Sequence, residues 1–276
     1  MSENQRVERR AGRVAISVTG KDAAHLLNDV LSGPVAAEPG PAQWWALLTP
    51  QGKILAEGLS AWHEGGFWLD IDPSVVDTFM KRMRLYTLRA DVIFTECSQS
   101  HVVGWSEGPV ADAVSDEDGR DKTLGHRIIA PADRAATWQD GDSYLARRIA
   151  LGLSELGPDF AADTTFPHDI GMDLLGGVDF EKGCYVGQEV VSRMKHRGTA
   201  RRRPVVVSGQ ALAAGAPVTA GEREAGTLGA VRDGKGVAIL RLDRIADPQA
   251  ATVGGAPASL ALPHWASYFF GGSGGD

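Results

Sequence analysis

The sequence predicts an α+β protein that ends in a small β domain, and two observations indicate it. Residues 44–95 contain three strand-like apolar runs, one helical segment and a further strand, an order that differs from the strict alternation of a doubly wound sheet. After Arg203 the chain consists of short apolar runs divided by glycines, such as "PVVVSG", "GTLGAV" and "GVAILRL". Such runs, which lack a helical period, are typical of a small β-barrel or sandwich.

The elements of the first half follow from periodicity and turn residues. "GRVAISV" (12–18) alternates like a strand, and we expect Thr19 to open a helix with Asp22 as its acidic N3 residue. "WWALLT", "ILAEGLSAW" and "FWLDI" are predicted strands, separated by the turn sequences "PQGK" and "HEGG". Asp72-Pro73 is expected to start a helix, and "DVIF" is a further predicted strand.

The second half contains one predicted loop and two predicted helices. Residues 106–122 are acidic and poor in large apolar side chains, so we expect an exposed loop there. "YLARRIALGL" (144–153) is a predicted helix, and a second helix is expected from Gly187 onward. The adjacent Trp44 and Trp45 are interpreted as core and hairpin packing.

Composition limits the class of protein. The chain has 276 residues, a formal net charge of −7 and two cysteines, Cys97 and Cys184. It has no CxxC pair for a self-contained zinc or iron–sulfur site, and its charge argues against a nucleic-acid or membrane-surface binder. No apolar run reaches the roughly 20 residues of a membrane span. We therefore expect a reduced, cytoplasmic protein without a membrane segment.

One short segment places a cysteine just before a predicted helix. In "EKGCYVGQEVVSRMKHRG" (181–198), Gly183 and Gly187 bracket Cys184, and both permit backbone angles that a side chain would resist. The helix start and Lys182 favour the thiolate form of this cysteine. Two interpretations stay open: an activated thiol that acts as nucleophile, ligand or redox sensor, and a small buried side chain that fills a turn.

This segment resembles a known family signature. "KGCYVGQE", followed by "SR" and "RG", is similar to the motif of the YgfZ-type folate-binding proteins, which are relatives of the glycine-cleavage T-protein (aminomethyltransferase). The similarity extends upstream through "FPHDIGMDLLGGVDF", and "TPQGKILAEGLSAW" resembles the family's early hairpin. The strong motif covers residues 166–203, and weaker similarity covers most of the chain.

The resemblance implies a fold and a role. The implied fold is a multi-part, T-protein-like α+β fold, with ferredoxin-like α+β units around a central folate channel and a C-terminal small β-barrel. We expect a folate-channel part formed by residues 1–43 plus 140–200, a ferredoxin-like part at 44–139 and the barrel at 201–276. The implied role is a tetrahydrofolate-binding accessory protein of iron–sulfur cluster assembly or repair, which indirectly supports cluster-dependent tRNA modification. Its partners would be reduced folate and iron–sulfur assembly or client proteins.

The resemblance and the local chemistry together predict the site residues. Cys184 and Lys182 are the expected functional centre, since the signature cysteine and lysine fall on them. The expected folate-binding residues are aromatic, acidic, amide or cationic: Tyr144, Phe166, Asp169, Tyr185, Gln188, Glu189, Arg193 and Arg197. No metal site is expected.

Two departures from the family pattern keep other activities open. A second flanking aromatic of the family falls near Arg13, where this chain has no ring, and the paired aspartates of the transferases correspond to Ala56 and Glu57. One alternative is a folate-dependent one-carbon (aminomethyl) transferase in which Glu57 or Asp169 supplies the acidic group. Another is a Cys-His hydrolase or acyltransferase that uses the His168-Asp169 pair with the cysteine.

A run of cations follows the cysteine motif. Three interpretations are open for it: a solvated helix end, a set of arginines that bind the glutamate carboxylates of folate, and an RNA contact. Direct nucleic-acid binding is not expected, since no aromatic residues are interleaved for base stacking. The run comprises Arg193, Lys195, Arg197, Arg201, Arg202 and Arg203.

Overall fold

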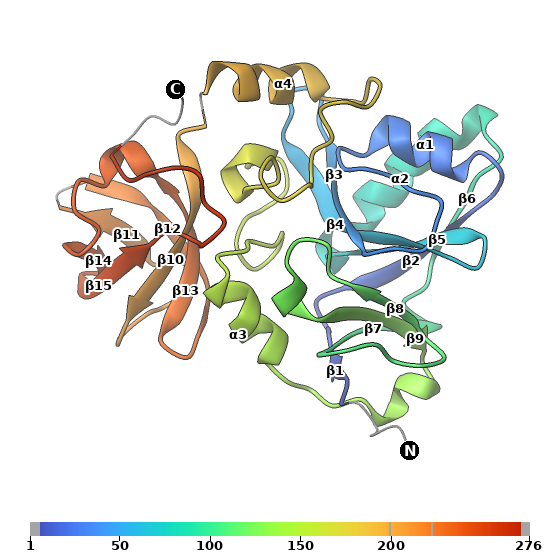
Figure 1. Cartoon of the computed structure of the whole chain (residues 1–276), viewed down its shortest axis with the longest axis horizontal. Coiled ribbons are helices and arrows are strands. Elements are labelled where there is room, and N and C mark those ends of the chain that lie inside the picture. The colour runs from blue at the N-terminus through green and yellow to red at the C-terminus, as the bar shows by residue number, and fades with distance from the viewer. Residues whose placement is uncertain (1–5, 199, 222, 272–276) are drawn as a thin grey trace. The chain divides into compact units, whose positions relative to one another are not determined.

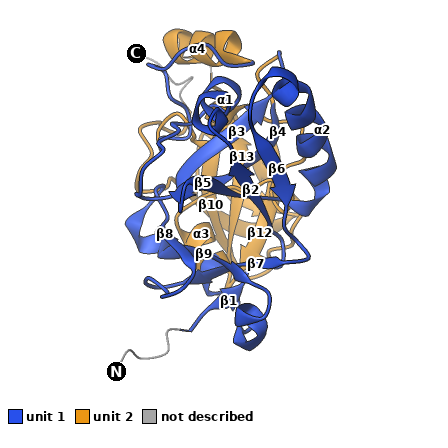
Figure 2. Ribbon diagram, turned by 90° about the vertical axis from the view of Figure 1, so that its right-hand side faces the viewer, with its two compact units in different colours: residues 1–50, 54–144, 175–186 blue, residues 51–53, 145–174, 187–276 orange. Residues whose placement is uncertain are grey.

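The computed structural model describes residues 6–198, 200–221 and 223–271 (Figure 1). The chain divides into two compact units, which Figure 2 draws in different colours. Unit 1 comprises Met1–Pro50, Ile54–Tyr144 and Leu175–Val186, and unit 2 comprises Gln51–Lys53, Leu145–Leu174 and Gly187–Asp276. The three-part division expected from the sequence stays a prediction.

Unit 1 contains a five-stranded antiparallel sheet in the order β3-β4-β5-β2-β6. Strands β3, β4 and β5 precede helix α2 and strand β6, so the strand-strand-strand-helix-strand order predicted for residues 44–95 is confirmed. The elements are β2 Val14–Thr19, α1 Ala23–Val30, β3 Gln43–Leu48, β4 Ile54–His63, β5 Gly66–Ile71, α2 Val76–Tyr86 and β6 Ile93–Glu96.

The core of this sheet is formed by large side chains from the strands and from α2. Trp44 and Trp45 on β3 are almost fully buried, and the ring of Phe79 on α2 lies 5.6 Å from that of Trp45. Burial of aromatic residues of this size contributes strongly to stability. The interpretation of both tryptophans as core residues is therefore confirmed.

The start of α1 differs from the expectation. Thr19 belongs to β2, where it pairs with Ile93, and α1 begins only at Ala23. Asp22 is its N-cap residue but makes no side-chain capping bond. Its carboxylate accepts a hydrogen bond from the backbone N–H of Asp91 instead (2.8 Å). The strand ends one residue later than predicted because Thr19 pairs with β6, a pairing that the local sequence does not show.

A second, four-stranded antiparallel sheet in unit 1 has the order β1-β7-β9-β8. The prediction of an exposed loop over residues 106–122 is wrong, because β8 lies within it. The acidic composition of this segment does not mean that it is exposed. Asp118 is buried, and its carboxylate accepts two hydrogen bonds from Arg120 (3.0 and 2.7 Å). The strands are β1 Glu8–Arg9, β7 His101–Ser106, β8 Val114–Glu117 and β9 His126–Pro131.

Unit 2 contains a closed six-stranded barrel in the order β10-β13-β12-β11-β14-β15. Alternate residues such as Val205 and Val207 on β10 are buried inside it, together with Leu228 and Leu240. Closure decides between the two predicted architectures in favour of the barrel. The strands are β10 Arg202–Gly209, β11 Pro217–Ala220, β12 Arg223–Arg232, β13 Lys235–Arg241, β14 Ala251–Val253 and β15 Ala256–Ala261.

The remaining helices belong to the segments around the cysteine motif. Helix α3 spans Ser143–Ala150, three residues shorter at its end than predicted, and helix α4 spans Gln188–Arg197. A short 3-10 turn, η5, covers Pro167–Ile170. No helix among the described residues is long and apolar enough to span a membrane.

Candidate functional site

The loop of residues 182–185, here called the cysteine loop, is attached to the end of α1 through Lys182. The ammonium nitrogen of Lys182 donates hydrogen bonds to the backbone carbonyls of Asn28 (2.9 Å), Leu31 and Gly33 (2.7 Å). The last carbonyls of a helix have no partner within the helix, and a lysine there also suits the negative end of the helix dipole. Lys182 therefore joins the cysteine loop to a segment about 150 residues earlier in the chain.

Burial gives Lys182 and Tyr185 unusual acid–base properties. Burial lowers the pKa of Lys182 to about 8, although Asp179 and Asp29 oppose the effect, so the ammonium form still predominates at pH 7. Burial, together with Asp179, raises the pKa of Tyr185 to about 12. The Lys182 ammonium lies 5.1 Å from the centre of the Tyr185 ring. Within the described residues, the buried Tyr185 hydroxyl has no hydrogen-bond partner.

The two cysteines lie in different environments. Cys184 is exposed, whereas Cys97 is buried against Ala15 and Val103. Of the two flanking glycines, only Gly187 has a left-handed backbone (φ 84°), and it forms the N-cap of α4. The interpretation of Cys184 as a buried side chain that fills a turn is therefore wrong.

This difference in exposure predicts the order of alkylation. We expect a limiting amount of iodoacetamide to modify Cys184 and to leave Cys97 unmodified in the folded protein, because reagent reaches only an accessible thiol. Mass spectrometry of the two cysteine peptides reports both sites in one experiment. Equal modification of both sites under native conditions would contradict the placement of the loop.

Removal of the Lys182 ammonium is expected to loosen the cysteine loop. Lys182→Met keeps the apolar stem but leaves three carbonyls without their donor, so we expect a loss of about 1–3 kcal/mol of stability. Hydrogen exchange should accelerate by about tenfold or more in the backbone amides around Cys184. Lys21→Met, which removes an exposed ammonium from the same unit, should change neither quantity. Unchanged exchange in Lys182→Met would show that the loop does not depend on this contact.

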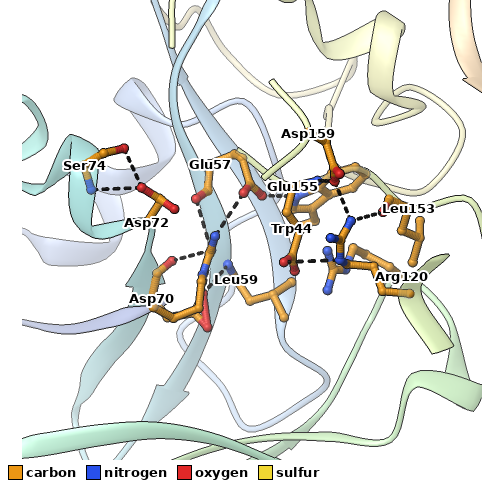
Figure 3. Close-up of polar contacts among 12 residues, drawn as sticks. Trp44, Glu57, Leu59, Asp70, Asp72, Ser74, Arg120, Leu153, Glu155 and Asp159 are labelled. Atoms are coloured by element: carbon orange, nitrogen blue, oxygen red, sulfur yellow. Dashed lines mark hydrogen bonds and ion pairs between the residues drawn. The ribbon is translucent and has the colours of Figure 1, made fainter. Parts of the chain in front are cut away.

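A buried charge network in unit 1 contains Glu57, the residue proposed to replace the transferase aspartates (Figure 3). One carboxylate oxygen of Glu57 accepts a hydrogen bond from Arg13 (3.1 Å), and the other accepts one from the indole N–H of Trp44 (2.8 Å). Arg13 also donates to the carboxylate of Asp70 (2.9 Å). Arg13 thus stands where the family's second aromatic was expected and links the carboxylates of two neighbouring strands. Both Glu57 oxygens already have partners within unit 1.

Tyr144 is also held by contacts within unit 1. Its hydroxyl accepts a hydrogen bond from Arg120 (2.8 Å), and the guanidinium of Arg10 lies 3.7 Å from the centre of its ring. The indole of Trp105 lies 6.5 Å away. The sequence predicts the Tyr144 ring as a site residue but not Arg10 or Arg120, because neither arginine belongs to a recognisable motif.

In unit 2, Phe166 is the N-cap residue of the η5 turn and Asp169 lies within this turn. The Asp169 carboxylate accepts a hydrogen bond from the backbone N–H of Phe166 (3.1 Å), and the ammonium of Lys53 lies 5.4 Å from the Phe166 ring. Burial raises the pKa of Asp169 to about 6, although the Phe166 N–H and the charges of Arg202, Arg203 and Lys53 oppose it. This carboxyl group can therefore hold or release a proton near neutral pH.

The adjacent His168 is almost fully buried. Burial lowers its pKa, with a further lowering from Arg203 and Lys195 and an opposite effect from Asp173, so the ring is neutral at pH 7. Arg203 donates to the backbone carbonyl of His168 (2.7 Å) and forms a two-pronged ion pair with Asp173 (2.7 and 3.0 Å). The pairing of His168 with the cysteine stays a prediction.

Four further predicted residues lie on α4. Glu189 and Arg193, one helical turn apart, form an exposed ion pair. Gln188 is half-buried in the first turn, and Arg197 is exposed in the last turn. All the predicted residues except Tyr144, which contacts Arg10, Arg120 and Trp105, thus fall into three groups: the 182–185 loop, the η5 turn and α4. Asp179, whose carboxylate accepts the backbone N–H of Glu181 and Lys182, was not predicted.

Comparison with known proteins identifies the family. Residues 200–268 match the model of the CAF17 C-terminal beta-barrel domain. The iron-sulfur cluster assembly factor IBA57, mitochondrial, of Mus musculus is 30% identical over 280 residues, which cover 86% of this chain and 78% of the mouse protein. The chain belongs to the IBA57/YgfZ family. An IBA57 homolog of Pyricularia oryzae is 32% identical over 69% of this chain and 54% of that protein.

The IBA57/YgfZ-family chain described here spans about half the length of its fungal relatives, 54% for Pyricularia oryzae and 55% for Mycosarcoma maydis. The names of these relatives place them in mitochondria, and the cytoplasmic location expected for this chain stays a prediction.

The fold of the family member matches a solved transferase. The crystal structure of glycine cleavage system aminomethyltransferase T from Bartonella henselae aligns with a TM-score of 0.75 and covers 97% of this chain and 88% of that chain. The sequences are 15% identical, so the match concerns the fold alone. The predicted T-protein-like fold with a C-terminal barrel is confirmed.

The residues present fit a reduced folate chemically. The ring of a folate offers amide-like donors and acceptors, and its tail carries carboxylates. The Tyr185 hydroxyl is a buried group that no other described residue satisfies, as expected for a ligand contact. Asp169 can accept or donate a proton, Phe166 supplies an aromatic face, and Arg193 and Arg197 supply cations.

Proposed function

We propose that this chain is a tetrahydrofolate-binding accessory protein of iron–sulfur cluster assembly or repair, which indirectly supports cluster-dependent tRNA-modifying enzymes. The observation that supports it most directly is the exposed Cys184, on a loop that Lys182 joins to α1, in a family whose curated relatives are named iron-sulfur cluster assembly factors. The proposed partners are reduced folate and proteins of cluster assembly or their clients.

The exposed thiol suits this role chemically. A cysteine thiolate is a soft ligand for iron and a good nucleophile, and both reactions require access from outside. The exposed Cys184 offers that access, while Cys97 does not. Cys184 is therefore the residue that we assign to the reaction or the cluster contact, and Lys182 is a residue that positions it.

The same unit contains a candidate for the folate contact. The hydroxyl of Tyr185, the residue after Cys184, is buried and lacks a partner in the described structure. A hydroxyl left without a partner reduces stability, and a bound folate that accepts its hydrogen bond would remove that cost. The candidates in unit 2 are Phe166 and Asp169 at the η5 turn, and Gln188, Glu189, Arg193 and Arg197 on α4.

An aminomethyl transferase that uses Glu57 is less well supported. Such an enzyme needs a carboxylate free to face the reacting folate nitrogen. Both oxygens of Glu57 instead accept hydrogen bonds from Arg13 and Trp44. A transferase would therefore depend on Asp169, and formation of product from an aminomethyl donor would identify it.

Calorimetric titration with 5-formyltetrahydrofolate tests the proposal. We expect saturable binding with a dissociation constant below about 1 mM. Tyr185→Phe should weaken binding by about tenfold, the effect of about one hydrogen bond, without reducing stability. Tyr268→Phe is the matched control, because the Tyr268 hydroxyl already donates to the Pro204 carbonyl (2.8 Å); it should reduce stability but not affinity. No binding at millimolar folate would refute the proposed function.

A further inference from the structure

The segment from the end of α4 to the start of β10 carries three exposed arginines. Arg197 ends α4, Arg201 directly precedes β10, and Arg202 is the first residue of β10; all three are exposed. Within the described residues, none of the three guanidinium groups takes part in an ion pair or hydrogen bond. A chain with a net charge of −7 thus presents a local cationic surface, and we call Arg201 and Arg202 the arginine pair.

Neighbouring arginines of the same run differ in this respect. Arg193 pairs with Glu189 on α4, and Arg203 forms the two-pronged ion pair with Asp173. These two arginines have structural partners. The helix dipole can account for Arg197 in the last turn, but not for the arginine pair, which lies beyond the helix.

Arg202 also departs from the usual pairing preferences of a β-sheet. In the β10–β13 ladder, Arg202 stands directly opposite Arg241. Side chains of directly opposite residues share one face, where like charges reduce stability. Asp243 forms an ion pair with Arg241 (2.6 Å), whereas Arg202 forms no ion pair within the described residues. A local departure of this kind is expected at a functional site.

The positive charge of this segment acts on Asp169, one of the proposed folate-binding residues. Strand β10 packs against the η5 turn, which carries Asp169 and follows Phe166. The positive charges of Arg202 and Arg203 counteract the effect of burial on the pKa of Asp169. The cationic surface is therefore continuous with one of the three groups of predicted site residues.

We propose that Arg201 and Arg202 bind the γ-linked glutamate tail of polyglutamylated reduced folates. The inference rests on the proposed folate binding and names the form of the ligand. Each added glutamate brings one α-carboxylate, and an arginine binds a carboxylate through two parallel hydrogen bonds. A run of carboxylates matches consecutive arginines, whereas RNA recognition would require aromatic side chains, which residues 193–204 lack.

Calorimetry with two forms of one folate tests the inference. We expect 5-formyltetrahydrofolate pentaglutamate to bind about tenfold or more tightly than the monoglutamate at low salt, with the difference shrinking as salt is added. The variant Arg201→Gln/Arg202→Gln should lose this difference and retain the monoglutamate affinity. Arg223→Gln/Lys235→Gln removes two exposed cations from β12 and β13 of the same barrel and should keep the difference.

The outcomes separate this inference from the proposed function. Equal affinities of the wild-type chain for the two folates would overturn the inference and leave the proposed function intact. Absence of binding by both folates would overturn both. If filter binding instead shows that unmodified transfer RNA binds through the arginine pair while the two folates bind equally, the surface recognises nucleic acid and the inference is wrong.

Discussion

Replacement of Arg13 by methionine is expected to lower the free energy of unfolding by about 3–5 kcal/mol. The guanidinium of Arg13 donates hydrogen bonds to Glu57 and Asp70, two almost fully buried carboxylates from neighbouring strands. Without it, the carboxylates stay buried close to each other with less positive charge between them. Removal of one member of a buried ion network is strongly destabilising for this reason.

Urea unfolding of the wild type and two variants measures this effect. Arg6→Met is the matched control, because the Arg6 side chain is 65% exposed and its contact with Glu8 is long (3.6 Å); it should change stability by less than about 1 kcal/mol. Addition of Asp70→Asn to Arg13→Met should restore part of the loss, since it removes one of the two uncompensated charges. A loss below about 1 kcal/mol in Arg13→Met would contradict the network.

The same network predicts the response to acid. Burial alone would raise the pKa of Asp70, but the charges of Arg13, Arg127 and Arg10 outweigh it, and the pKa is lower than in the unfolded chain. The folded state thus binds fewer protons than the unfolded state, so the contribution of Asp70 is fully present above the unfolded pKa of about 3.9 and is lost as the pH falls through the folded value. Arg13→Met should reduce this loss of stability below about pH 4.

Substitution of Cys184 by alanine is expected to abolish the proposed function while leaving the fold intact. The exposed thiol buries little area, so we expect the unfolding free energy to change by less than about 1 kcal/mol. In cells whose own family member is deleted, the variant should leave cluster-dependent tRNA modification at the level of the deletion. Mass spectrometry of modified nucleosides measures this activity.

Cys97→Ala is the matched control with the opposite expectation. The Cys97 side chain packs against Val114 and Ile129, so its truncation should cost about 1 kcal/mol or more of stability. Because this thiol is buried away from reagents and partners, tRNA modification should persist. Full activity of Cys184→Ala, or a loss of several kcal/mol in its stability, would remove this cysteine from the centre of the proposal.

Much of the fold and the position of the cysteine loop were predictable from local patterns. Alternation of apolar residues marked β3, β4 and β5, the Asp72-Pro73 pair marked the segment that leads into α2, and glycines divided the strands of the barrel. The family motif around Cys184 is a contiguous run of residues, so it can be recognised in the sequence alone. Each of these features is formed by residues within about ten positions of each other. The local sequence is therefore enough to predict them.

What only the tertiary structure decided concerns contacts between distant residues. Lys182 binds backbone carbonyls 149 to 154 positions away. Every residue has a backbone carbonyl, so the sequence does not show which ones a lysine will bind. Glu57 meets Arg13 across 44 positions, which turned a candidate acid into part of a buried network. Pairing with β9 made a strand of an acidic stretch predicted as a loop. In each case the stabilising energy comes from a partner brought close by folding, and a local pattern contains no measure of that distance.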